Sequence, residues 1–119
     1  MRVVCERDAE LKQCHRVGLE GNLDALGAAA LWDGVSDRVG PEMPALLIDM
    51  SGVRYMSSGG IGVLVRLLAR VQQIGGGLSV YACSPRVRCV MGIVGLEGIL
   101  NVRETEADAR ARLTELGIT

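Results

Sequence analysis

The chain has 119 residues, a length typical of one domain, and its 49% hydrophobic and 23% charged residues are ordinary for a globular protein. We therefore expect residues 1–119 to form a single domain. A formal net charge of −1 argues against direct nucleic-acid binding, which depends on clustered Lys and Arg. No apolar run approaches the roughly 20 residues of a membrane span, and no signal-peptide segment follows Met1, so we expect a cytoplasmic protein without membrane insertion.

The N-terminal part contains two predicted strands followed by a helix. Met1–Cys5 and about Gln13–Leu19 have strand character, and the first of them can run antiparallel to the rest of a sheet. Apolar residues then recur at three- and four-residue steps, which predicts an amphipathic helix. Asp24 is its expected N-cap, and Gly40–Pro41 is expected to end it.

The middle of the chain continues with a strand and a second helix. Residues 45–50 form a near-continuous apolar run, typical of a central strand covered on both faces. Ser51–Gly52 and Ser57–Gly60 are expected to bracket a short connection. Apolar residues spaced from Ile61 to Val71 then mark an amphipathic helix.

Strands and helices also alternate in the C-terminal part. Gly75–Gly77 ends the second helix, residues 78–82 form a strand, and Ser84–Pro85 has the pattern that begins a helix. A last helix spans roughly Glu104–Leu116. This alternation predicts an α/β fold with a mixed, mostly parallel sheet of about four to five strands and about four helices packed against it.

The four cysteines and the single histidine form no pattern that indicates a metal or redox site. None of the intervals between successive cysteines is the two-residue spacer of zinc and thioredoxin-like motifs. We expect reduced and mostly buried thiols, with a redox switch at Cys83 and Cys89 as the alternative. His15 has charged and polar neighbours on a predicted strand, and we expect it to be solvated. The sequence therefore predicts no metal and no cofactor.

Two other polar features are typical of ordinary structure. Asp49 stands at the expected end of the central strand, where parallel sheets often place functional groups. We favour a structural role, in which it hydrogen-bonds the turn backbone at Ser51 and Gly52. Arg66 and Arg70 lie on the polar side of the second helix and are expected to be solvated.

The stretch from Leu47 to Leu64 carries the most information. A strand leads into hydroxyl residues and glycines at a helix start, where unpaired N–H groups and the helix dipole favour a bound anion or a phosphoserine. Helix capping alone also accounts for these serines and glycines. No Gly-Lys-Ser/Thr follows, and the glycines lack the spacing of a dinucleotide fingerprint, so nucleotide chemistry is not favoured.

This stretch resembles the STAS domain of bacterial anti-sigma-factor antagonists. In that family a strand is followed by Asp-hydrophobic-Ser-Gly, a short link and Asp-Ser-Ser/Thr-Gly-hydrophobic-Gly. Leu19–Asp24 is similar to the family's second strand running into its first helix, Gly77–Val80 to the strand after the central helix, and Val94–Leu96 with Ile99–Val102 to its closing segment. The resemblance covers nearly the whole chain, and it implies a non-enzymatic interaction module.

The sequence departs from the family pattern at the residue that is phosphorylated in switched members. Aligning Gly60-Ile61-Gly62 with the family's Gly-hydrophobic-Gly places Ser57 at the Asp position, Ser58 at the first Ser and Gly59 at the phosphoacceptor. Either Ser58 or Ser57 accepts phosphate instead, or phosphorylation does not switch the protein. We favour the second, because glycine leaves the surface permanently uncharged.

By resemblance, we expect a docking surface for an anti-sigma factor or related serine-kinase-fold regulator, whose capture would release a sigma factor. Its expected residues are Asp24, Met56, Ser57, Ser58, Gly59, Gly60 and Ile61.

Two other functions and one assembly stay open. One is a STAS subunit in a stress-signalling complex or in a lipid- or anion-transport assembly. The other is a small anion or nucleotide binder, since fold does not fix function. An enzyme is not expected, because a nucleophile at Ser57 or Ser58 would need a base and His15 is the sole histidine. A homodimer is also left open.

Overall fold

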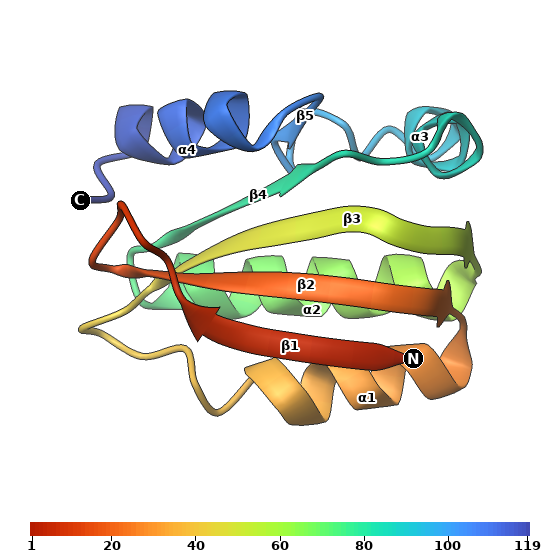
Figure 1. Cartoon of the computed structure of the whole chain (residues 1–119), viewed down its shortest axis with the longest axis horizontal. Coiled ribbons are helices and arrows are strands. Elements are labelled where there is room, and N and C mark those ends of the chain that lie inside the picture. The colour runs from red at the N-terminus through yellow and green to blue at the C-terminus, as the bar shows by residue number, and fades with distance from the viewer.

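The computed structural model describes all residues, 1–119, and contains one five-stranded sheet and four helices (Figure 1). The strands lie in chain order, with β1 antiparallel to β2 and the other neighbours parallel. This confirms the predicted α/β fold and the antiparallel first strand. The elements are β1 (Arg2–Arg7), β2 (Cys14–Leu23), α1 (Ala25–Val35), β3 (Ala45–Met56), α2 (Ser58–Gln73), β4 (Gly77–Tyr81), α3 (Pro85–Ile93), β5 (Val102–Arg103) and α4 (Glu106–Glu115).

Two hydrophobic clusters lie on opposite faces of the sheet. The larger one has 22 buried residues and joins the inner sheet face to α1, α2 and α3. The smaller one, with seven buried residues, lies beneath α4 and includes Leu47 and Leu113. Because α4 lies over β3–β5 and over Cys14 at the start of β2, the rest of the outer face of β1 and β2 has no covering helix (Figure 1). None of the helices has the length and apolar character of a membrane span.

The predicted turn after residue 50 is wrong, because β3 continues to Met56. The neighbouring strand β2 also runs on, to Leu23, and pairs with this part of β3, while Val53 and Met56 turn their side chains into the core. The register changes between the pairs Gly18–Asp49 and Glu20–Gly52, which leaves two residues of β3 opposite one of β2. Such a bulge bends a strand without ending it.

The bulge also explains Asp49. Its Oδ1 accepts a hydrogen bond from the Ser51 N–H at 2.9 Å, so the predicted contact with the Ser51 backbone is confirmed. The contact stabilises the irregular step inside β3, and Asp49 does not stand at the strand end as expected. A Cβ on Gly52 would overlap the Leu19 carbonyl oxygen, so this glycine is needed for the close approach of the two strands.

Two helices begin at residues whose side chains cap them, and one helix ends earlier than expected. Ser84 and Thr105 accept hydrogen bonds from the backbone three residues on and begin α3 and α4. Helix α1, however, ends at Val35 and not at Gly40. Val39 reaches the core from the following loop, so the apolar spacing continues beyond the helix itself.

Two expectations about side chains are corrected. His15 is buried, and because a carbonyl oxygen only accepts, its Nε2–H donates to the Arg38 carbonyl at 2.8 Å. Arg70 is half-buried and donates to the Val39 carbonyl, whereas Arg66 is exposed as expected and stacks on Trp32, with 3.9 Å from Cζ to the ring centroid.

All four cysteines are free, as expected, but only Cys14 is fully buried, while Cys89 is exposed. Burial raises the pKa of Cys14 to about 12 and that of Cys83 to about 11. Both thiols therefore stay protonated at neutral pH, which makes them poor nucleophiles.

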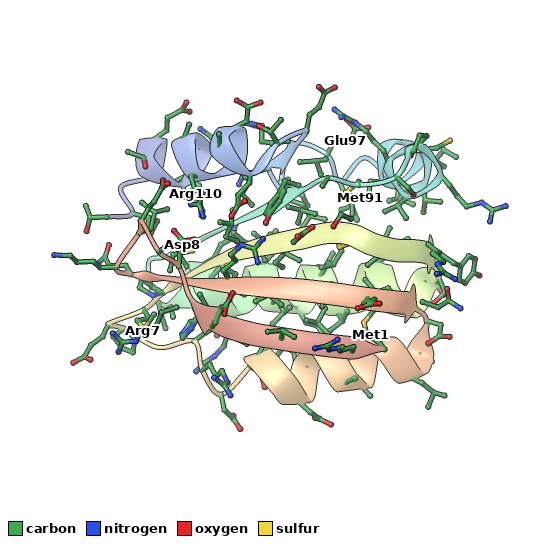
Figure 2. The ribbon with its side chains drawn as sticks, in the orientation of Figure 1. Met1, Arg7, Asp8, Met91, Glu97 and Arg110 are labelled. Carbon is green, nitrogen blue, oxygen red and sulfur yellow. The ribbon has the colours of Figure 1, made fainter.

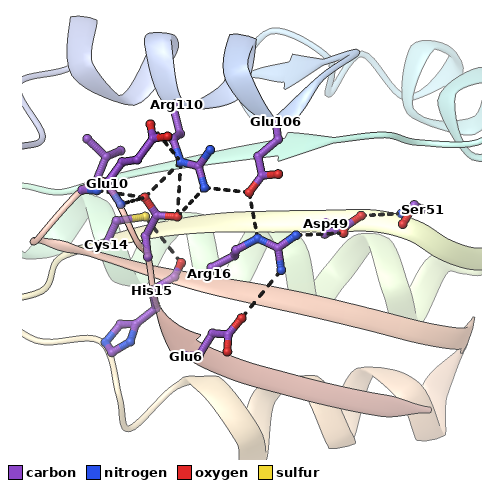
Figure 3. A network of polar contacts seen from close by, with 11 residues as sticks. Glu6, Glu10, Cys14, His15, Arg16, Asp49, Ser51, Glu106 and Arg110 are labelled. Carbon is purple, nitrogen blue, oxygen red and sulfur yellow. Dashed lines mark hydrogen bonds and ion pairs between the residues drawn. The ribbon is translucent and has the colours of Figure 1, made fainter.

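A chain of ion pairs fastens α4 to the β1–β2 region (Figure 3). The Asp8 side chain is fully buried and pairs with Arg110, whose Nη2 lies 2.8 Å from Oδ1 (Figure 2). Arg110 also contacts Glu106 at 2.7 Å, and Glu106 accepts from Arg16 Nε at 2.8 Å. Arg16 then reaches Asp49 at 3.4 Å. Residues far apart in the sequence are thereby held in one network.

Removing the charge of Asp8 tests this network. Asp8→Asn keeps the size of the side chain but leaves Arg110 without its buried counter-ion, so the free energy of unfolding should fall by about 3 kcal/mol. Chemical denaturation measures this loss. The control is Arg88→Ala, which removes exposed ion pairs to Glu97 and Glu104 and should cost less than about 1 kcal/mol. Equal losses in the two variants would contradict the account.

The Asp8 carboxyl should also make the stability of the protein depend on pH. Burial by itself would raise the pKa of the Asp8 carboxyl, but hydrogen bonds from Arg110 and from the Leu11 and Glu10 N–H groups outweigh it and hold the pKa below its usual range. The resulting stability is present above the ordinary Asp pKa of about 3.9 and is lost as pH falls through the lower folded-state value. Wild type should therefore lose more stability than Asp8→Asn between about pH 4 and pH 2.

Candidate functional site

Two helices begin side by side where β2 and β3 end. Leu23 and Met56 are paired across these strands, and each strand leads directly into a helix, α1 or α2. Asp24 caps α1, its Oδ1 accepting the Gly27 N–H at 2.9 Å. The Ser57 N–H donates to the Leu23 carbonyl at 3.0 Å and so ties the start of α2 to the end of β2. The predicted cap at Asp24 is confirmed.

Two glycines make this junction sterically feasible. A Cβ on Gly60 would overlap the Leu23 carbonyl oxygen and would also press on the Leu23 and Met56 side chains. A Cβ on Gly27 would likewise overlap the Asn22 carbonyl oxygen. Each helix start therefore lies closer to a strand end than any residue with a side chain would permit.

Gly59, at the family's phosphoacceptor position, lies between the two helix starts. It is half-buried, and a Cβ there would lie 3.3 Å from Ala25 Cα and 3.4 Å from Ala25 N. A small side chain at residue 59 therefore requires a slight shift of α1 or α2. Because Gly59 has no side chain, it adds neither charge nor bulk to the groove between the helices.

The two serines differ in exposure. Ser57 is the N-cap residue of α2 and is half-buried, but its side chain makes no capping hydrogen bond. Ser58 is the first residue of α2 and is exposed. The N–H groups of Ser58, Gly59 and Gly60 lie in the first turn of α2, where the helix offers them no acceptor, whereas that of Ile61 donates to the Ser57 carbonyl. The start of α2 therefore offers free donors next to an accessible hydroxyl.

The other predicted site residues lie deeper. Met56 is 4% exposed and belongs to the larger core cluster, Gly60 is buried, and Ile61 is half-buried against that cluster. These three residues support the surface from beneath, while Asp24, Ser57, Ser58 and Gly59 lie at or near solvent.

Sequence reasoning missed two exposed apolar side chains at this end of the molecule. Leu26, in the first turn of α1, is 84% exposed, and Tyr55, next to the end of β3, is 47% exposed. Leu26 is one residue from Ala25, which contacts Gly59, and Tyr55 is two residues before Ser57. Leu26 lies within an apolar helix pattern, which suggests a buried side chain. Tyr55 lies just after the predicted turn at Ser51–Gly52, where no exposed apolar residue was expected.

A groove between α1 and α2 continues from this surface. Small residues of both helices line it, and the stacked Trp32 and Arg66 stand at its far end. The small residues are Ala25, Ala28, Ala29, Gly59 and Gly62. The exposed surface around Leu26, Tyr55, Ser58 and Gly59, together with this groove, is called the helix-start surface below.

The geometry offers Ser57 and Ser58 no histidine base. His15 lies near the beginning of β2, while the serines follow strand ends level with Leu23. His15 and Leu23 are eight residue steps apart along an extended strand, a distance of roughly 26 Å. No group of three or more His, Cys, Asp and Glu side chains is placed to hold a metal ion.

The comparisons with known proteins agree with this fold. The model of a protein family described as "Mlab, STAS domain" matches residues 7–102. An anti-sigma factor antagonist from Mycobacterium paratuberculosis is 27% identical, with 95% of this chain and 93% of that chain covered and a TM-score of 0.78.

Two further solved structures share the fold at lower identity. The anti-sigma factor antagonist SpoIIAA in its unphosphorylated form is 19% identical over 96% of this chain and 97% of that chain, with a TM-score of 0.79. A sulfate transporter family protein from Wolinella succinogenes is 18% identical over 88% of each chain, with a TM-score of 0.74. The same fold thus occurs in regulators and in transport proteins.

The close approach of Gly60 to β2 predicts different stabilities for two glycine-to-alanine variants of α2. Gly60→Ala forces a Cβ against the Leu23 carbonyl and should lower the free energy of unfolding by about 3 kcal/mol. Gly62→Ala, in the same helix, meets nothing within 4 Å and should stabilise the protein by up to about 1 kcal/mol. Thermal unfolding measures the stability of the two variants. A Gly60→Ala variant as stable as wild type would show that the approach of residue 60 to the Leu23 carbonyl does not constrain the fold.

Proposed function

The chain belongs to the STAS family, and we propose that it is an anti-sigma-factor antagonist that binds an anti-sigma factor of the serine-kinase fold. Capture of that partner releases a sigma factor for transcription. On this proposal residues 1–119 act as one STAS domain in the cytoplasm, as a binding module and not as an enzyme. The match to the M. paratuberculosis antagonist supports this choice among STAS functions.

The observation that carries the proposal is the uncovered start of α2. The first-turn N–H groups of α2 have no acceptor within the helix, and neither α1 nor α2 has an acidic residue in its first turn. Carbonyl or carboxylate oxygens of a partner complement such a helix start. Leu26 and Tyr55 add exposed apolar area at this end of the molecule, and partner interfaces draw much of their energy from aromatic side chains such as Tyr55.

Phosphorylation acts on this surface through Ser58 or Ser57, or not at all, and Ser58 is the more exposed of the two hydroxyl residues. A phosphate on Ser58 would occupy the free N–H groups of α2 itself and would bring about two negative charges to the contact. Gly59 has no hydroxyl, so the usual family position cannot be modified. We favour a surface that is always competent to bind, with partner abundance and not phosphorylation setting the response.

A second function is favoured by a specific observation. The matching family model is the one described as "Mlab, STAS domain", and one similar structure is a sulfate transporter family protein. A STAS subunit of a lipid- or anion-transport assembly would use the same helix-start surface, but its partner would be a transport component. The identity of the captured partner separates the two functions.

A charge at residue 59 tests the proposed surface. In a pulldown from extract of the native cells, wild type should retain a kinase-fold regulator, and Gly59→Asp should lose it because the carboxylate opposes the partner's acceptor oxygens. Gly59→Ala controls for the 3.3 Å approach to Ala25 and should retain most of the binding. Capture of a transport component would favour the second function. Equal capture by wild type and Gly59→Asp would show that the helix-start surface does not bind the partner in either of the two functions.

Restoring the family's hydroxyl tests the loss of the switch. Incubated with the captured kinase-fold partner and ATP, Gly59→Ser should take up phosphate, whereas wild type should take up little. Intact-protein mass spectrometry measures the difference, and Ser58→Ala in the wild-type background identifies any phosphate on Ser58. Stoichiometric labelling of wild type that Ser58→Ala abolishes would show that the switch has moved by one residue and is not lost.

A further inference from the structure

Strand β1 is an edge of the sheet and has no partner on its outer side. It pairs along its whole length with β2, from Arg2 opposite Glu20 to Arg7 opposite His15. The one side-chain hydrogen bond to its backbone comes from Arg38, whose Nη1 lies 3.4 Å from the Cys5 carbonyl oxygen. An open edge of six residues is a template for another strand.

The side chains of this edge are complementary to themselves. Arg2, Val4 and Glu6 are exposed on the outer face, whereas Val3 and Cys5 pack against the core on the inner face. Arg2 forms no ion pair within the chain. The Glu6 side chain is 60% exposed and reaches Arg16 only at 3.8 Å. Val4, which is 43% exposed, lies between the two charges.

From this pattern we propose that two copies of the chain form a homodimer by antiparallel pairing of β1 with β1, centred on Val4. Around that centre Arg2 of each copy lies opposite Glu6 of the other. Val4 lies opposite Val4, and Val3 lies opposite Cys5. The dimer therefore gains two ion pairs and one apolar contact on the outer face, and its two sheets join into one of ten strands.

Symmetry selects this register. A two-fold axis between two antiparallel strands keeps the core faces of both copies on the same side of the joined sheet. A residue whose side chain lies on the outer face must therefore pair with another outer-face residue, and an inner-face residue with another inner-face residue. Centring on Cys5 would put Val4 opposite Glu6 and Val3 opposite Arg7, and centring on Val3 would put Arg2 opposite Val4. Only the axis at Val4 pairs opposite charges.

Two parts of the molecule lie next to this edge. Helix α1 packs against β1, with its Gly34 against Val3, and Figure 1 shows it on the outer side of β1. The two α1 helices of the dimer therefore meet across the two-fold axis. Arg38 is exposed and its contact with Cys5 is long, so its side chain can move aside.

A cysteine at the two-fold axis tests the arrangement directly. In a Cys5→Ser, Cys89→Ser background, Val4→Cys should form a disulfide-linked dimer under mild oxidation, because residues directly opposite in antiparallel strands are within disulfide reach. The control is Glu20→Cys in the same background. It is exposed on the same face but one strand further from the axis, and it should stay monomeric on a non-reducing gel.

Sedimentation equilibrium of the unmodified chain gives the second readout. The mass should rise from 12.7 kDa toward twice that value with concentration, with half-association at roughly 100 µM for so small an interface. Arg2→Glu should weaken association about tenfold, and adding Glu6→Arg should restore it. A monomer at all concentrations, or equal cross-linking of Val4→Cys and Glu20→Cys, would overturn the dimer.

Discussion

The helix-start surface depends on one close approach between backbones, that of Gly60 in α2 to the Leu23 carbonyl at the end of β2. No residue with a Cβ fits there, and the neighbouring Gly27 meets the Asn22 carbonyl under the same restriction. These two contacts fix the starts of α1 and α2 against adjacent strand ends. Gly59 is thereby held against Ala25, and the free N–H groups of α2 lie beside the start of α1. The glycines of this motif thus have a structural role whether or not a partner is present.

The opposite side of the sheet is stabilised by different means. There the Asp8–Arg110–Glu106–Arg16 network joins α4 to the loop after β1 and to β2, over a sequence separation of 102 residues between Asp8 and Arg110. The network involves none of the residues of the helix-start surface. Substitutions at that surface can therefore be interpreted as effects on binding, provided that they avoid Gly60 and Gly27 and that Gly59→Asp is compared with Gly59→Ala.

Much of the fold follows from the sequence, because apolar periodicity and caps at Asp24 and Ser84 mark its helices. The sequence could not show that β3 continues through Ser51–Gly52, since a bulge and a turn have the same local composition. The burial of His15 depends on the distant Arg38 carbonyl, and the exposure of Leu26 depends on what packs beside α1. Such facts belong to tertiary contacts and leave no local signal.

The candidate site was predictable to a similar extent. Residues 56–61 are contiguous, so their proximity was certain, and the resemblance to the family brought Asp24 to the same place. Only the structure shows that Ser58 is exposed whereas Met56 and Gly60 are buried. It also shows that Leu26 and Tyr55 are exposed at the same end of the molecule.

Hydrogen–deuterium exchange of the chain, alone and bound to its captured partner, tests the central claim most directly. The account predicts slower exchange at residues 24–27 and 55–62 in the complex, with α4 unchanged. Protection confined to α4 or to the outer face of β1 and β2 would contradict it.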